Sequence, residues 1–192
     1  MSRLVAFLMI AVLGLGTPWL ATAKEMSAKE KEAKRAEIRA TANETLGDLE
    51  KIQPGAKKLI DRSAGYAVFS NVGVKIFVAG SGQGQGIAID RKTGKATYMK
   101  MLEVQGGLGL GIKKFRLVWV FQNRSDLDAF INSGWEMGAQ ANATAQTGDV
   151  GGGIAGAVSV KPGVYLFQLT DDGLSAELTV KGTKYYKNDD LN

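Results

Sequence analysis

The sequence predicts an α+β fold, in which a curled antiparallel β-sheet or barrel-like sheet has N-terminal helices and one mid-chain helix packed on it. A segment rich in Ala, Lys and Glu, typical of helix, is followed by short runs of β-forming residues between turns. No strand–helix–strand alternation recurs, so a parallel sheet is not expected. Glycine falls at every other position from Gly80 to Gly86. Because alternate residues of a strand face opposite sides, one face there is bare backbone, so a group packs closely on it or the sheet curls.

The composition argues against enzymatic chemistry. The 192 residues include no histidine and no cysteine, which removes imidazole bases, thiol nucleophiles, disulfides and the commonest metal ligands together. The sequence therefore predicts a protein that is not an enzyme and that has no cofactor and no metal site. Its length allows one domain once a targeting segment is removed.

Residues 1–23 have the pattern of a secretory signal peptide. Arg3 supplies the positive charge, an apolar stretch follows it, and Ala21-Thr22-Ala23 forms an A-x-A cleavage site. An uncleaved membrane anchor is the alternative, although two glycines and a proline leave the apolar span shorter than the ~20 residues that a bilayer needs. Cleavage near Ala23 predicts a periplasmic or secreted protein.

Residues 24–52 predict a helix with an apolar stripe that begins only at Ile38. Residues 24–37 are therefore expected to form a solvated helical arm, and residues 38–192 a single domain. Basic residues flank the stripe and acidic residues lie opposite, which is the pattern of a helix on a membrane. Two interpretations remain open: the stripe lies on a membrane, or it docks on the sheet.

The rest of the chain predicts two helices and several strands. Residues 56–63 form a short basic helix after an interruption at Pro54-Gly55, and Ser125 caps a mid-chain helix that stops at Gly134. Asp90 to Gly94 turn a hairpin between two of the strands. The expected strands are 66–69, 74–79, 84–89, 96–102, 107–112, 116–121, 154–160, 164–170 and 174–180.

Two kinds of motif suggest chemistry, and their context argues against both. Residues 151–156 match G-x-G-x-x-G, but strand and turn residues follow instead of the helix that a nucleotide site requires. A two-carboxylate hydrolase needs its acids across a cleft. The carboxylate pairs at 126/128, 171/172 and 189/190 instead lie at a helix start, in a turn and in the C-terminal tail.

Two basic clusters are the remaining functional signal. If they share one face, each base could contribute ~1 kcal/mol to attachment to an anionic lipid surface, and scattered solvated charge is the alternative. The formal net charge of +5 fits either interpretation. Nucleic acid is not an expected partner, because interleaved aromatic residues are missing. The candidate lipid-binding residues are Lys57, Lys58 and Arg62 in the second helix and Lys113, Lys114 and Arg116 at a strand junction.

Several short motifs, in order, resemble the SYLF domain family over about residues 40–187. The family includes bacterial exported proteins and lipoproteins, and eukaryotic actin-patch and membrane-trafficking proteins. The motifs are Ala64-Gly65-Tyr66-Ala67-Val68-Phe69, the alternating glycines of 80–86, Gln105-Gly106-Gly107-Leu108-Gly109, the 127–134 helix leading to 135–138, and Gly173-Leu174-Ser175-Ala176.

The resemblance implies a non-enzymatic module that binds anionic phospholipids or phosphoinositides. Family members use an N-terminal amphipathic helix and a basic surface, which here corresponds to residues 38–62, and some fungal members bind actin. This chain departs from the family in lacking the lipobox cysteine and in having Thr97-Tyr98-Met99-Lys100 where many members have Trp and Pro. The alternative function is a structural or protein-interaction module of the cell envelope, in which the sheet presents an edge to a partner.

Overall fold

The computed structural model describes residues 25–76, 79–106, 111–134, 136–137, 156–171, 173–175 and 182–192. The predicted signal peptide and the glycine-rich motif at 151–155 lie outside these ranges.

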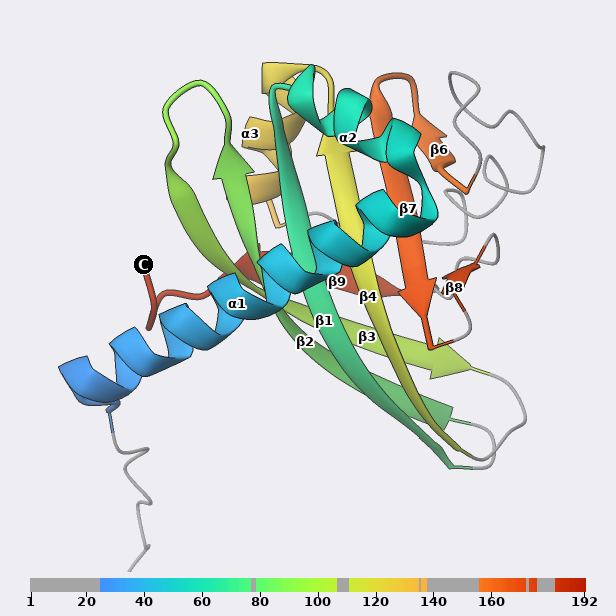
Figure 1. Ribbon diagram of the computed structural model, residues 1–192. Coiled ribbons are helices and arrows are strands. Elements are labelled where there is room, and N and C mark those ends of the chain that lie inside the picture. The colour runs from blue at the N-terminus through green and yellow to red at the C-terminus, as the bar shows by residue number, and fades with distance from the viewer. Residues whose placement is uncertain are drawn as a thin grey trace, which may run out of the picture.

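The described residues form helices on a curled antiparallel sheet, as the sequence predicts (Figure 1). The elements are α1 (Ala28–Ile52), α2 (Pro54–Asp61), β1 (Gly65–Ile76), β2 (Ala79–Asp90), β3 (Ala96–Gly106), β4 (Gly111–Phe121), α3 (Arg124–Asn132), β5 (Glu136–Met137), β6 (Val158–Lys161), β7 (Val164–Thr170), β8 (Gly173–Ser175) and β9 (Thr183–Lys187). The strands described here make one sheet in the order β5-β9-β3-β2-β1-β4-β7-β6, with β8 paired to β7. Helices α1 and α2 cover its outer face, and α3 lies behind the sheet at one end (Figure 1).

The alternating glycines of β2 line the inner face of the curl. A Cβ atom at Gly86 would lie 2.5 Å from Cδ1 of Phe69, and one at Gly82 would lie 2.8 Å from Nδ2 of Asn71. The same Cβ at Gly82 would lie 2.9 Å from Oε2 of Glu103, which accepts a hydrogen bond of 2.6 Å from Asn71 Nδ2. Other side chains therefore pack closely on the bare face, and this buried polar pair crosses β2 where a side chain is missing.

An aromatic cluster fills the upper part of the inner face. The ring centroids of Phe69 and Tyr185 are 4.9 Å apart, and those of Phe121 and Phe130 are also 4.9 Å apart. Phe130 comes from α3, so the mid-chain helix is held by its buried aromatic ring. Burial raises the pKa of the Tyr185 hydroxyl.

Helix α1 docks its apolar stripe on the outer face of the sheet. Ile38 and Leu49 are buried there with residues of β1 and β4. The Arg35 and Arg39 guanidiniums lie 5.9 and 5.5 Å from the centroid of the Tyr98 ring, so cation–π contacts add to this docking. Residues 28–37 are mostly exposed. Of the two interpretations of this helix, the structure shows the docked one.

Several boundaries differ from the expected ones. Residues 66–69 and 74–79 were expected as separate strands, but β1 is continuous to Ile76, because its backbone pairs regularly with β2 and β4 on both sides. Helix α2 begins at Pro54 and not at residue 56. Proline is tolerated there because the N–H of the first helical residue has no partner within the helix. The residue that caps α3 is Asn123, not Ser125. Strand β9 was not expected at all.

The upper end of β3 has an unusual partner. Strand β9 pairs with Met99 to Glu103 only, so Tyr98 lies beyond it. Asn192 Oδ1 accepts a hydrogen bond of 2.9 Å from the Tyr98 N–H, and Asn192 Nδ2 donates one of 2.8 Å to the Tyr98 carbonyl. The Tyr98 carbonyl also accepts a hydrogen bond of 2.9 Å from the Asn188 N–H, so Asn188 and Asn192 together satisfy the backbone of β3 as a neighbouring strand would.

Candidate functional site: a basic end of the half-barrel

Helix α2, the β2–β3 turn and the start of α3 meet at one end of the half-barrel (Figure 1). The Arg91 N–H donates to the Ala64 carbonyl at 3.1 Å, and Arg124 Nη1 lies 2.9 Å from Asp90 Oδ2. These contacts join the three elements into one surface, which we call the basic end. Its exposed cations are Lys57 and Lys58 on α2, Arg62 directly after it, Arg91, Lys92 and Lys95 at the turn, and Arg124 on α3.

The turn is held rigidly by Asp90. Its carboxylate accepts hydrogen bonds from the Thr93 hydroxyl at 2.5 Å and from the backbone N–H of Lys92 at 2.9 Å. The hydrogen bond from the Thr93 hydroxyl has the largest effect in holding the pKa of Asp90 below its usual range. The backbone N–H groups of Lys92 and Thr93 and the charge of Arg124 lower this pKa further. Gly94 has φ +70°, a conformation that glycine adopts without strain. These contacts fix the backbone of the turn that carries the cations.

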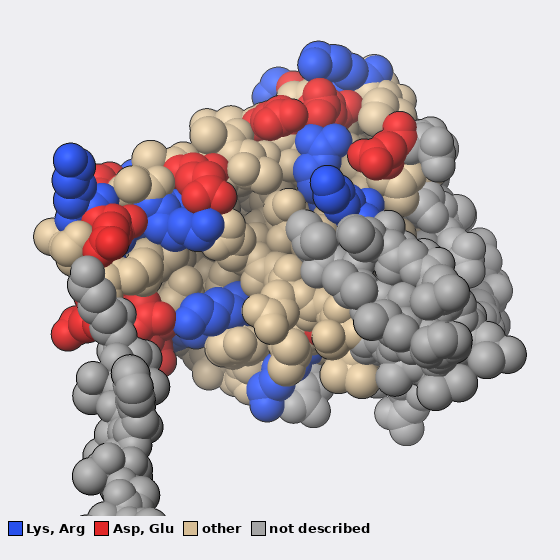
Figure 2. All heavy atoms as spheres, turned by 90° about the horizontal axis from the view of Figure 1, so that it is seen from below, with Lys and Arg blue, Asp and Glu red and all other residues tan. Residues whose placement is uncertain are grey.

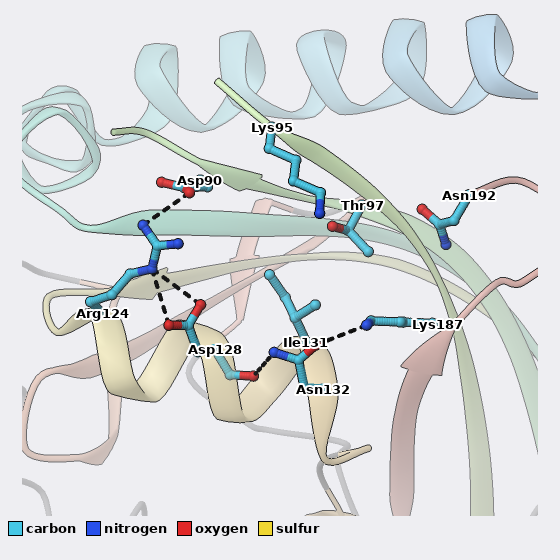
Figure 3. A pocket seen from close by; sticks show the side chains of 9 residues that line it. All are labelled: Asp90, Lys95, Thr97, Arg124, Asp128, Ile131, Asn132, Lys187 and Asn192. Atoms are coloured by element: carbon cyan, nitrogen blue, oxygen red, sulfur yellow. Dashed lines mark hydrogen bonds and ion pairs between the residues drawn. The ribbon is translucent and has the colours of Figure 1, made fainter. Parts of the chain in front are cut away.

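A cavity of about 180 Å³ opens beside this turn, between α3 and the ends of β3 and β9 (Figure 3). Arg124 forms one wall, where its Nε lies 3.1 Å from both carboxylate oxygens of Asp128. Lys95 and Lys187 point into the cavity from the other side (Figure 3). A wider, more open depression of about 790 Å³ adjoins it and shares Arg124 and Asp128.

Only one of the two predicted basic clusters lies at the basic end. Lys57 and Lys58 of α2 and Arg62 directly after it are exposed, and Lys57 pairs with Asp61 at 2.9 Å. The hydrogen bond that Lys57 Nζ donates to the Asp61 carboxylate raises the pKa of Lys57.

The second predicted cluster, on β4, is separate. Arg116 Nη1 lies 2.9 Å from Asp48 Oδ2 of α1, so its charge is used to dock that helix. Lys114 is exposed, and the side chain of Lys113 lies outside the described residues. Figure 1 shows α1 between α2 and the first half of β4. The two clusters do not form one continuous surface.

The sequence interpretation missed four cations of the basic end. The sequence analysis includes Arg91 and Lys92 only in the hairpin turn at Asp90 to Gly94, and it assigns no role to Lys95 or Arg124. Three bases within Asp90 to Lys95 were a signal in the sequence. Their proximity to α2 depends on the tertiary fold.

Several basic residues of α1 pair with nearby acidic residues, so the helix does not present a continuous basic surface. Figure 2, viewed from below, shows acidic side chains beside basic ones rather than one continuous basic area. The ion pairs of this helix include Lys31–Glu25, Lys34–Glu37, Arg35–Glu32 and Lys51–Asp48, with N···O distances of 2.9 to 3.4 Å.

The described carboxylates are placed for structure. Asp126 accepts a hydrogen bond of 2.5 Å from Lys161 Nζ, and this bond holds the pKa of Asp126 below its usual range. A general acid needs the opposite shift. Within the ranges that the structure describes, no group of three acidic residues is placed to hold a metal ion. In the same part of the chain, no helix has the length and apolar character to span a membrane.

No family model matches the chain. It is similar to Beta cell expansion factor A of Aeromonas veronii, with 36% identity over 163 residues, which are 84% of this chain and 59% of that protein. The chain thus spans about three fifths of the length of this relative.

Proposed function

We propose that this protein is a non-enzymatic module that binds anionic lipid surfaces through its basic end. The observation that supports this proposal is the excess of charge there. Seven exposed cations lie on three adjoining elements, and three carboxylates, Asp61, Asp90 and Asp128, pair with them in the described structure. Each base near an anionic surface contributes about 1 kcal/mol, so several acting together are enough for reversible attachment.

The proposal keeps the ligand class that the SYLF resemblance implies and moves the binding surface. Lys57, Lys58 and Arg62 remain in it, whereas Arg116 is removed because it pairs with α1. The amphipathic helix is not the contact, since its apolar stripe packs on the sheet. A periplasmic or secreted location after cleavage near Ala23 remains part of the proposal.

Vesicle co-sedimentation with matched charge variants tests the proposal. K58E/K92E reverses two exposed lysines at the basic end, and K29E/K114E reverses two exposed lysines elsewhere, with the same change in net charge. Two lost attractions and two new repulsions of about 1 kcal/mol each predict a loss of about 4 kcal/mol for the first variant only.

The wild-type protein is expected to bind vesicles that contain an anionic phospholipid at low salt and to dissociate as salt rises. No binding at low salt contradicts the proposal. Equal losses in the two double variants would show that net charge, and not the basic end, is responsible.

A structural or protein-interaction role in the envelope is the alternative. Strand β6 lies at an edge of the described sheet and could pair with a partner strand. Charge reversal at the basic end would leave that contact intact.

The relative's name suggests a further candidate, a factor that acts on beta cells. The 36% identity over most of this chain supports it, although that protein is longer. Adding the purified chain to cultured beta cells and counting dividing cells tests this role.

A further inference from the structure

The cavity in Figure 3 has two walls of different charge. On one wall, the Arg124 guanidinium contacts the carboxylates of Asp90 and Asp128. Asp90 also accepts hydrogen bonds from the turn, as described above. Both carboxylates are therefore already engaged by neighbouring donors.

The other wall carries two ammonium groups. Lys187 Nζ donates a hydrogen bond of 2.8 Å to Asn132 Oδ1, a neutral amide oxygen that leaves the charge of the lysine uncompensated. Lys95 is exposed and forms no ion pair with any described residue. The Thr97 hydroxyl lines the cavity close to Lys95 (Figure 3). This wall thus offers two positive charges and a hydroxyl donor to one small volume.

We propose that this cavity binds a phosphomonoester group between Lys95 and Lys187. Such a group carries a charge of nearly −2 at pH 7 and has three strong acceptor oxygens. The two ammoniums match its charge, and Thr97 supplies a third donor. The cavity of about 180 Å³ has the volume of roughly six waters, which accommodates a phosphate. A phosphodiester, with a single charge, is bound more weakly.

The phosphomonoester can belong to a lipid headgroup or be a free phosphate. In the lipid case the inference rests on the proposed function and adds headgroup selection to a general attraction for anionic surfaces. In the free case it stands alone. Inorganic phosphate and vesicles are therefore tested separately.

The first experiment titrates inorganic phosphate into the full chain and follows backbone amides by NMR. Shifts are expected at residues around the cavity, and K95Q and K187Q should each weaken binding about tenfold, as loss of one charge-assisted hydrogen bond predicts. K58Q and K92Q are matched controls, because they remove the same charge from the basic end without lining the cavity. Binding should also strengthen from pH 5.5 to 8, as the phosphate gains its second charge.

The second experiment compares vesicles of phosphatidic acid, a monoester, with vesicles of phosphatidylglycerol, a diester, at equal surface potential. A preference for phosphatidic acid over phosphatidylglycerol that is lost in K95Q/K187Q supports the lipid headgroup. K58Q/K92Q should weaken binding to both lipids by the same factor and keep this preference, since these two lysines belong to the basic end and do not line the cavity. If inorganic phosphate binds at the cavity but vesicles do not bind, the ligand is a free phosphate. That result contradicts the proposed function and leaves the inference about the cavity intact.

Two results overturn the inference. One is the absence of phosphate shifts around the cavity together with equal binding to both lipids. The other is an equal loss of phosphate binding, and of the preference for phosphatidic acid, in K95Q/K187Q and K58Q/K92Q. That result would show a non-selective basic end and would leave the proposed function intact.

Discussion

Replacing Gly86 with alanine should destabilise the fold more than the small size of the change suggests. The added Cβ would lie 2.5 Å from Cδ1 and 2.7 Å from Cγ of Phe69, and it would also collide with the Val68 carbonyl oxygen. Phe69 is only 1% exposed and packs on Tyr185 and Phe130. Neither the ring nor the backbone oxygen can move aside without disturbing the inner core.

The expected loss is about 3 kcal/mol, the upper end of the usual range for overpacking. Since small domains are stable by about 5–15 kcal/mol, this is a large share. Gly47 provides the control, because no atom lies within 4 Å of a Cβ added there. G47A should stabilise α1 by about 0.5–1 kcal/mol, as alanine does in a helix.

Urea unfolding followed by tryptophan fluorescence measures both variants, since Trp119 is fully buried beside the mutated region. The difference between G86A and G47A should approach 4 kcal/mol. If G86A unfolds within about 1 kcal/mol of the wild type, the proposed close packing on the bare face of β2 is wrong.

Three further predictions concern the core, pH dependence and local stability. F130A should cost about 3–5 kcal/mol in urea unfolding, because its ring is completely buried between α3 and the sheet; a loss below 1 kcal/mol contradicts that packing. Folding lowers the pKa of Asp126, so its ionised carboxylate stabilises the fold at a pH above its unfolded-state pKa, near 4. This stabilisation is lost as the pH falls through the folded-state pKa. D126N should therefore lower the melting temperature at pH 7 and not at pH 2, and an equal loss at both values would argue against the Lys161 pairing. In hydrogen exchange, amides of residues 28–37 should exchange faster than those of 38–49, since only the latter segment is docked; uniform protection would contradict this.

Local signals in the sequence predict the parts of the fold that depend on local chemistry. The hairpin at Asp90 to Gly94 and the stop of α3 at Gly134, which has φ +63°, follow from turn and cap preferences. The bounds of β7 agree with the expected 164–170 for the same reason. Strand β9 could have been found from Thr183-Lys184-Tyr185-Tyr186-Lys187, whose β-forming residues resemble those of the other strands.

The candidate site was less predictable, because it depends on long-range pairing. Lys58 and Arg62 stand out in the sequence as part of a basic helix. Arg116 looks equivalent to them until its pairing with Asp48, 68 residues away, is known. Lys95 and Lys187 are brought to one cavity only because β9 pairs with β3. Composition shows how many bases there are, and topology determines which of them remain available.

The hydrogen bonds from Asn192 to Tyr98 protect the molecule against self-association. A β-strand whose backbone groups are unpaired is a template for addition of strands from other molecules. Here the Asn192 amide pairs with both backbone groups of Tyr98, and the Asn188 N–H bonds to the same carbonyl, so strand addition at that stretch of β3 is blocked. Losing the Asn192 amide would leave the Tyr98 N–H open to a strand from another molecule, at the same end that carries the positive charge.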